Sequence, residues 1–302
     1  MAIRISIAVL ALTGTLAFAA TNRQLGVDVQ MIVTSADHMN HRPPALKAGD
    51  LKIADATITG LIPFKSGREL ELFILIDDSA NYDFDGKLQE LRRFVTSQPA
   101  PVSIGVAFIR EGTLDVVEQP TRDHQRAAQA LRAPSGSIAA DPYCALSSLI
   151  DGWKTKSLRR EVILVSTGID DSATGVVCEN ADTTIQDAER AGVVVYGLYN
   201  PVTSYDSDKW SRIESGIVDL SHVAHETGGE AYFSGHSPTA SLEPFLADIT
   251  EHLANQYLVK FRLAHGADSS FEAIHVTSGT VDRELMKPEK IWVSGPASVS
   301  GN

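Results

Sequence analysis

The chain has 302 residues, a formal net charge of −12 and 43% hydrophobic residues. Its length suits one large domain or two modest ones, and its apolar share is high enough for a buried core. An acidic chain without a cluster of lysine and arginine is a poor candidate for binding nucleic acids or anionic membranes, so we expect neither as a partner.

The first 19 residues have the pattern of a signal peptide. Arg4 supplies the positive charge, residues 5–18 supply an apolar stretch, and residues 17–19 (Ala-Phe-Ala) supply a small-x-small cleavage signal. The apolar stretch is too short to span a bilayer. We therefore expect a secreted or periplasmic protein that does not insert into the membrane after the signal is removed.

Residues 20–68 are predicted to form an N-terminal β segment. Alternating apolar stretches at 27–33, 51–53 and 57–64 are typical of strands, and turn residues separate them.

Residues 69–256 are predicted to form an α/β domain. Strand patterns occur at 71–76, 102–109, 113–118, 161–166, 193–198 and 230–233. Helical patterns occur at 88–95, 124–131, 144–153, 181–191, 219–226 and 241–255. Strands that alternate with helices indicate a doubly wound, mostly parallel sheet of the Rossmann-like kind.

Residues 257–295 return to a β pattern, with strands expected at 256–263, 271–277 and 291–293. We expect this C-terminal β segment to pack with the N-terminal one as a small discontinuous β domain. Residues 296–302 are expected to form a disordered tail.

A polar stretch, Asp77-Asp78-Ser79-Ala80-Asn81, directly follows the buried strand predicted at 71–76. Ligands of open α/β sheets bind at the carboxyl ends of the strands. Asp77, Ser79 and Asn81 stand at alternate positions, so their oxygens can converge on a divalent cation. The alternative is a polar turn in which Ser79 or Asn81 caps the next helix.

Several pieces of the chain together resemble the von Willebrand factor A domain. They are the Asp77-x-Ser79-x-Asn81 loop, Ser166-Thr167-Gly168 after a later strand, and Gly228-Gly229-x-x-Tyr232 before an amphipathic helix. The resemblance covers roughly residues 25–295 and is strongest to secreted bacterial proteins called VWFA-related. It implies a metal-ion-dependent adhesion site, a bound Mg²⁺ (or Mn²⁺ or Ca²⁺), and a protein ligand.

The resemblance places the metal ligands on three loops. The first loop is Asp77, Ser79 and Asn81, with Asn81 where the family usually has serine. The second loop lacks the family's threonine, and Ser137 is the nearest hydroxyl. The third loop has Thr167 where the family has aspartate, with Asp170 close behind. Because one missing ligand is an anion, we expect a degenerate site that binds metal weakly or not at all.

The two cysteines, Cys144 and Cys178, are expected to form a disulfide, because an isolated pair in an oxidising compartment is more often bonded than free. The alternative is that each packs alone as a small apolar side chain. If the fold is as predicted, the bridge would join the second and third loops of the site.

The functional expectation is an exported, non-enzymatic protein-binding or adhesion-type module. The alternative is a structural or assembly module of the bacterial envelope that uses its β domain for contacts and binds no metal. A hydrolase is not expected, because we find no nucleophile with an adjacent base.

Overall fold

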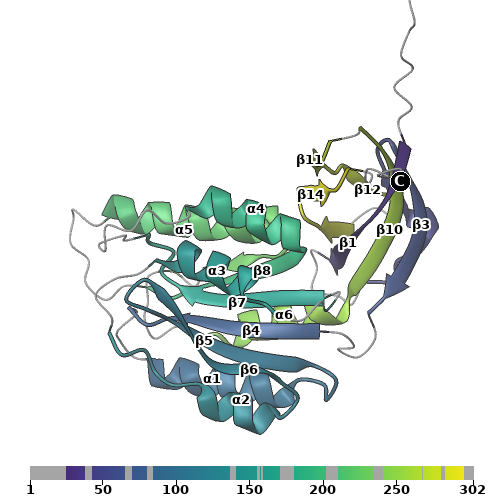
Figure 1. Cartoon of the computed structure of the whole chain (residues 1–302). Helices are drawn as coiled ribbons and strands as arrows, with labels where there is room; N and C mark the ends of the chain where they lie inside the picture. The colour runs from purple at the N-terminus through teal and green to yellow at the C-terminus, as the bar shows by residue number, and fades with distance from the viewer. Residues whose placement is uncertain are drawn as a thin grey trace, which may run out of the picture.

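The computed structural model describes residues 25–37, 43–64, 70–79, 84–136, 141–154, 157, 159–170, 180–201, 210–233, 235, 241–266, 268–279 and 283–295. These residues form a helix-covered central sheet and, beside it, a set of antiparallel sheets (Figure 1). The predicted fold class is therefore confirmed. None of the described helices is long and apolar enough to cross a membrane.

The central sheet has six strands in the order β6-β5-β4-β7-β8-β9. Their bounds are β4 (Leu70–Asp77), β5 (Ser103–Arg110), β6 (Thr113–Thr121), β7 (Arg159–Ser166), β8 (Val193–Tyr199) and β9 (Ala231–Tyr232). All pair in parallel except β6, which runs antiparallel to β5. Counted from β4, the spatial order is 3-2-1-4-5-6, which is the order of a doubly wound fold.

In the described part of the chain, six helices cover the two faces of this sheet. They are α1 (Phe84–Ser97), α2 (His124–Ala130), α3 (Pro142–Asp151), α4 (Ala181–Ala191), α5 (Trp210–Glu226) and α6 (Glu243–Ala254). One face packs against α1, α2 and α6, and the other against α3, α4 and α5 (Figure 1).

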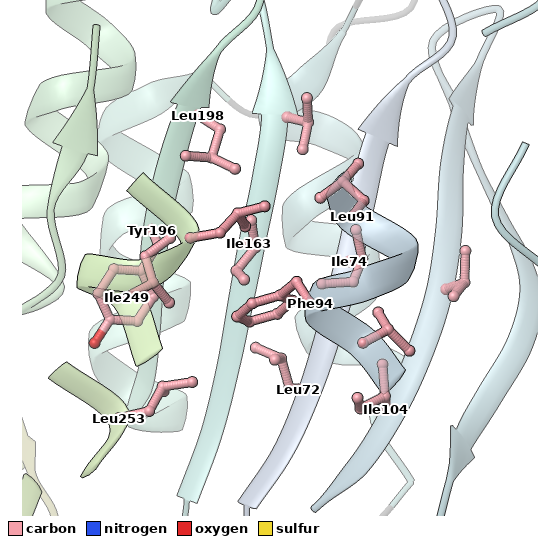
Figure 2. Close-up of a cluster of buried hydrophobic side chains, with 14 of the residues drawn as sticks. Leu72, Ile74, Leu91, Phe94, Ile104, Ile163, Tyr196, Leu198, Ile249 and Leu253 are labelled. Atoms are coloured by element: carbon pink, nitrogen blue, oxygen red, sulfur yellow. The ribbon is translucent and has the colours of Figure 1, made fainter. Parts of the chain in front are cut away.

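Alternate residues of the central strands face opposite helix layers, because side chains in a strand alternate. On β4, Leu72 and Ile74 belong to the first core, together with Phe94 of α1 and Ile249 of α6 (Figure 2). Phe73 and Leu75 belong to the second core, under α3 and α5. The continuous apolar pattern of this strand follows from burial on both faces.

Helix α4 shows how local sequence sets an element's bounds. The Asn180 side chain accepts a hydrogen bond from the Thr183 amide (3.0 Å), and Gly192 ends the helix in the left-handed conformation (φ 66°). Asparagine and glycine are favoured at these two positions. The helix spans Ala181–Ala191, as the sequence predicts.

The antiparallel part joins strands from both ends of the chain. Its largest sheet has the order β13-β1-β10-β3, and β11 pairs with β14 and β12 with β2. The bounds are β1 (Leu25–Asp37), β2 (Leu51–Ile53), β3 (Ala56–Pro63), β10 (Gln256–His265), β11 (Ser270–Ala273), β12 (Val276–Ser278), β13 (Arg283–Met286) and β14 (Lys290–Val293), with a 3₁₀ turn, η1, at Ala48–Asp50. One core that includes Val33, Phe261 and Ile291 lies among them. The domain boundaries given above stay predictions.

A buried ionic network links the antiparallel part to the amino ends of the central strands. The Arg159 guanidinium, at the start of β7, donates to Glu161 (2.9 Å), to the Gln256 side chain (2.6 Å) and to the Leu253 carbonyl (2.5 Å). Because Gln256 begins β10, this network fixes the junction between the two parts. The antiparallel sheets thus lie beside the amino ends (Figure 1).

Two expected elements differ from the structure, and one strand was not expected. Helix α5 begins at Trp210 and not at 219; Trp210, Ile213 and Ile217 have helical spacing, but Gly216 weakens the pattern in this half. The strand expected at 271–277 is two strands, β11 and β12, which pair with different partners. Strand β13 was not expected, since its four residues carry a weak pattern.

Candidate functional site

The carboxyl ends of β4 and β7 meet at the point where the strand order reverses. Chain connections on either side of this point leave in different directions, and ligands of doubly wound sheets bind in the resulting crevice. Asp77 is the last residue of β4, and Ser166 is the last residue of β7. The Ser166 hydroxyl donates to Asp77 Oδ2 (2.9 Å), so the two strand ends are in direct contact. We call the described residues Asp77, Ser79, Ser166, Thr167 and Asn200 the carboxyl edge.

The Asp77 carboxylate is fully buried and is hydrogen-bonded to neutral groups. Its Oδ1 accepts from the Ser79 amide (2.9 Å) and from the Ser79 hydroxyl (2.6 Å). Burial raises the pKa of the Asp77 carboxyl, although the hydrogen bonds from Ser79, Ser166 and Thr167 oppose this effect. Within the described part of the chain, no lysine or arginine pairs with Asp77. Its negative charge is therefore stabilised by hydrogen bonds alone.

The neighbouring Asp78 has the opposite environment. Arg132 donates to both carboxylate oxygens (2.7 and 3.0 Å), and the Ser135 amide and hydroxyl add two more hydrogen bonds (2.6 Å each). Arg110 lies 3.6 Å from Oδ2. Burial favours a higher pKa, but these hydrogen bonds and the Arg132 charge outweigh it and hold the pKa of Asp78 below its usual value. Asp78 is thus neutralised and holds the segment containing Arg132 against the sheet.

The loop after β7 is held by a close backbone contact. Gly168 has φ +69°, and a Cβ on it would lie 2.0 Å from the Gly216 carbonyl oxygen of α5. The Tyr143 hydroxyl of α3 donates to the Gly168 carbonyl (2.9 Å). Only glycine satisfies both the backbone angle and the close approach. The loop therefore presents Thr167 in a fixed position beside the end of β4.

A buried lysine at the carboxyl edge was missed by the sequence reasoning. Lys87 of α1 donates to Asn200 Oδ1 (2.7 Å), and the Asn200 amide donates to the Ser166 carbonyl (2.8 Å). A lysine in an amphipathic helix is usually exposed. Its position gives the signal that could have revealed it, since residue 87 shares a helix face with the buried Phe84 and Leu91.

The structure brings together Asp77, Ser79 and Thr167, and their role as metal ligands stays a prediction. Asp170 follows this loop with an exposed side chain. Asn81 and Ser137 lie outside the described residues. Cys144 lies in the first turn of α3, but Cys178 is also outside the described residues, so the disulfide stays a prediction.

Asp77 and Ser79 have a geometry that suits a divalent cation. Their side-chain oxygens are 2.6 Å apart, and neighbouring oxygens around an octahedral Mg²⁺ are about 2.9 Å apart. A buried carboxylate without a cationic partner also fits a metal ligand. Among the described candidates, however, Thr167 supplies a neutral oxygen where a second carboxylate would strengthen binding.

A second group of possible ligands lies under α6, at the β9 side of the sheet. Glu230, Asp248 and His252 each place one ligand atom within 4.8 Å of the others. Burial lowers the pKa of His252, although the neighbouring acids oppose this, and burial together with Asp248 and Glu284 raises the pKa of Glu230. Asp248 and His252 are four residues apart, a spacing visible in the sequence, but nothing there links them to Glu230.

Aromatic side chains flank the carboxyl edge. Phe233 follows β9 and is 45% exposed, and its ring centroid lies 5.0 Å from that of Tyr199 at the end of β8. Trp210, at the start of α5, is also exposed. Exposed aromatic rings beside polar side chains are typical of surfaces that contact other proteins.

No family model matches the sequence, and no curated protein matches it. Solved structures do match. Proximal thread matrix protein 1 from the mussel byssus is 14% identical, with 69% of this chain and 50% of that chain covered and a TM-score of 0.45. A von Willebrand factor type A structure from Catenulispora acidiphila is 12% identical, with 92% and 76% covered and a TM-score of 0.44.

The type V pili tip protein Mfa5 from Porphyromonas gingivalis, solved as three N-terminal domains, is 9% identical, with 89% and 66% covered and a TM-score of 0.44. The chain thus spans half the length of the mussel protein that it matches. At these low scores the likenesses carry no argument about function. The fold class rests on the strand order of the central sheet.

Proposed function

We propose that the chain is an exported, non-enzymatic protein-binding module whose carboxyl edge contacts a protein ligand. The observation that carries this proposal is the pairing of Asp77 and Ser166 at the reversal point of the sheet. Ligands of doubly wound folds bind at this point. The exposed rings of Phe233 and Trp210 add apolar contact area on the same side of the molecule.

The proposed site includes a place for a divalent cation. Asp77 and Ser79 would hold the cation. A carboxylate of the partner protein would then bind to the cation as a further ligand. Titration calorimetry with Mg²⁺, Mn²⁺ and Ca²⁺ tests this part. Ser79→Ala, which keeps the buried carboxylate and removes one oxygen, should weaken binding, whereas Asp85→Asn on the exposed side of α1 should leave it unchanged. A flat titration up to millimolar metal would overturn the cation part of the proposal.

A second candidate function is an assembly module that makes its contacts through the antiparallel part. Strand β3 is the outer strand of the largest antiparallel sheet, and its Ile62 is 45% exposed. Outer strands can pair with strands of other proteins. This observation favours the second candidate independently of the carboxyl edge.

Photo-crosslinking separates the two candidates, because Phe233 and Ile62 have the same exposed fraction. A photoreactive phenylalanine is placed at one position or the other in the exported full chain. Crosslinks from position 233 that disappear with Ser79→Ala support the carboxyl edge. Crosslinks from position 62 alone, unaffected by Ser79→Ala, would overturn the first proposal in favour of the second.

A further inference from the structure

The cluster of Glu230, Asp248 and His252 is built from two neighbouring elements. Asp248 and His252 are four residues apart in α6 and therefore lie on the same face of the helix. Glu230 directly precedes β9, and its carbonyl accepts a hydrogen bond from the Gly197 amide of β8 (2.9 Å). Sheet pairing thus fixes the backbone of Glu230 opposite this helix face.

The surroundings hold the cluster in place. The Tyr232 hydroxyl donates to Asp248 Oδ2 (2.7 Å) and lies 3.3 Å from His252 Nδ1. The Tyr196 ring stacks on the His252 ring, with an interplanar angle of 23°. His252 is only 6% exposed. Groups that orient a ligand side chain in this way are a regular part of metal sites.

One nitrogen of the buried imidazole has no hydrogen-bond partner among the described residues. It is Nε2, and Asp248 Oδ2 lies 3.8 Å from it, too far for a hydrogen bond. Within the same part of the chain, no lysine or arginine lies within ion-pair distance of Glu230 or Asp248. Two carboxylates therefore lie beside one imidazole, Glu230 at 3.9 Å from Nδ1 and Asp248 at 3.8 Å from Nε2, with no lysine or arginine among the described residues to compensate them.

The separations fit a small transition-metal ion. Ligand atoms around a tetrahedral Zn²⁺ are about 3.3–3.5 Å apart, since Zn–N and Zn–O bonds are about 2.0–2.2 Å. One ligand atom from each of Glu230, Asp248 and His252 lies within 4.8 Å of the other two, so side-chain rotations that bring these atoms about 1.4 Å closer, with one nitrogen of His252 facing both carboxylates, would form such a site. A cavity of about 270 Å³, lined in part by Glu230 and Glu284, reaches the Glu230 side of the cluster.

We propose that Glu230, Asp248 and His252 bind a divalent transition-metal ion of the Zn²⁺ type, with water completing the coordination. Imidazole and carboxylate ligands together favour such an ion over Mg²⁺ or Ca²⁺. This site is separate from the carboxyl edge, since β9 is three positions from β4 in the sheet. The proposal does not depend on the proposed function.

Titration calorimetry of the untagged full chain with ZnCl₂ tests the proposal. We expect one saturable site per chain, and Glu230→Gln should weaken it at least tenfold, since it replaces a charged ligand by a neutral one. The side chain of Glu230 is half-exposed, so this variant should fold. His252→Ala should abolish the site, and circular dichroism checks that this variant is folded.

Glu251→Gln is the matched control, because it removes the same charge from an exposed position next to His252. It should leave Zn²⁺ binding unchanged, and so should Ser79→Ala at the carboxyl edge. Absence of saturable binding would overturn the proposal. Equal weakening by Glu230→Gln and Glu251→Gln would overturn it too, because it would show only a general attraction of the acidic surface.

Discussion

Buried charged side chains have different partners at the two ends of the central sheet. At the amino end, Arg159 and Glu161 form a buried ion pair whose remaining hydrogen bonds go to the start of β10 and the end of α6. Burial still raises the pKa of Glu161, although Arg159 and Gln256 oppose this effect. At the carboxyl end, the donors to Asp77 among the described residues are all neutral. A buried charge that is paired with an opposite charge can hold two parts of the fold together. A buried carboxylate without a cationic partner among the described residues can instead bind a cation.

The amino-end pair gives the largest expected effect. Arg159→Ala leaves the Glu161 carboxylate buried without its partner and should lower the free energy of unfolding by about 3–5 kcal/mol. Urea denaturation measures the loss. Arg262→Ala is the control, since its ion pair with Asp28 also involves β10 but is exposed, and it should change stability little. Similar effects of the two substitutions would mean that the buried pair does not hold the junction.

Asp78, next to Asp77 at the carboxyl end, is paired with an arginine, as Glu161 is at the amino end. Asp78→Asn loses the two-pronged contact with Arg132 and should destabilise the fold by about 2–3 kcal/mol at neutral pH. Because the pKa of Asp78 is lowered in the folded state, its contribution should disappear as the pH falls below the ordinary value of 3.8. Asp115→Asn, at the exposed partner of Arg110, should have little effect. A loss that does not become smaller as the pH falls below 3.8 would contradict the ionic origin.

Glu189, on the amino side of the sheet, is buried without the charge compensation, among the described residues, that Glu161 has from Arg159. It therefore allows a further test of the comparison. It is 6% exposed, its Oε1 accepts from the Lys290 amide of β14 (3.1 Å), and its Oε2 has no hydrogen-bond partner among the described residues. Burial raises its pKa from 4.5 to about 7, Lys290 opposes this, and Glu226 and Glu289 add to it.

The sign of the pH effect at Glu189 follows from this shift. The folded state favours the protonated form, so stability from this group is full below pH 4.5 and falls as the pH rises to about 7. Glu189→Gln should therefore be about 1–2 kcal/mol more stable than the natural chain at pH 8, with little difference at pH 4. Urea denaturation at both pH values measures this. Equal stability at pH 8 would show that Glu189 is compensated.

The sequence predicts the fold where local and tertiary signals agree. The asparagine and glycine at the ends of α4 and the apolar runs of β4 and β7 are local signals, and these elements were predicted well. The first half of α5 was missed because its helix is stabilised by packing around Gly216, which has no helical signal of its own. Strand β13 was missed because only its pairing with β1 defines it.

The site was predicted in part for the same reason. Asp77, Ser79 and Thr167 follow strands whose ends must meet in a parallel sheet, so their proximity follows from the pattern. Arg132 could not be assigned to Asp78, since 54 residues separate them and only the tertiary fold brings them together.

The most direct test of the comparison is the carboxyl titration of Asp77 and Asp78, followed by ¹³C NMR of the metal-free chain. We predict shifts of opposite sign, with the pKa of Asp77 above and the pKa of Asp78 below the ordinary value of 3.8. A lowered pKa at both residues would contradict the central claim, because Asp77 would then already have a compensating positive charge.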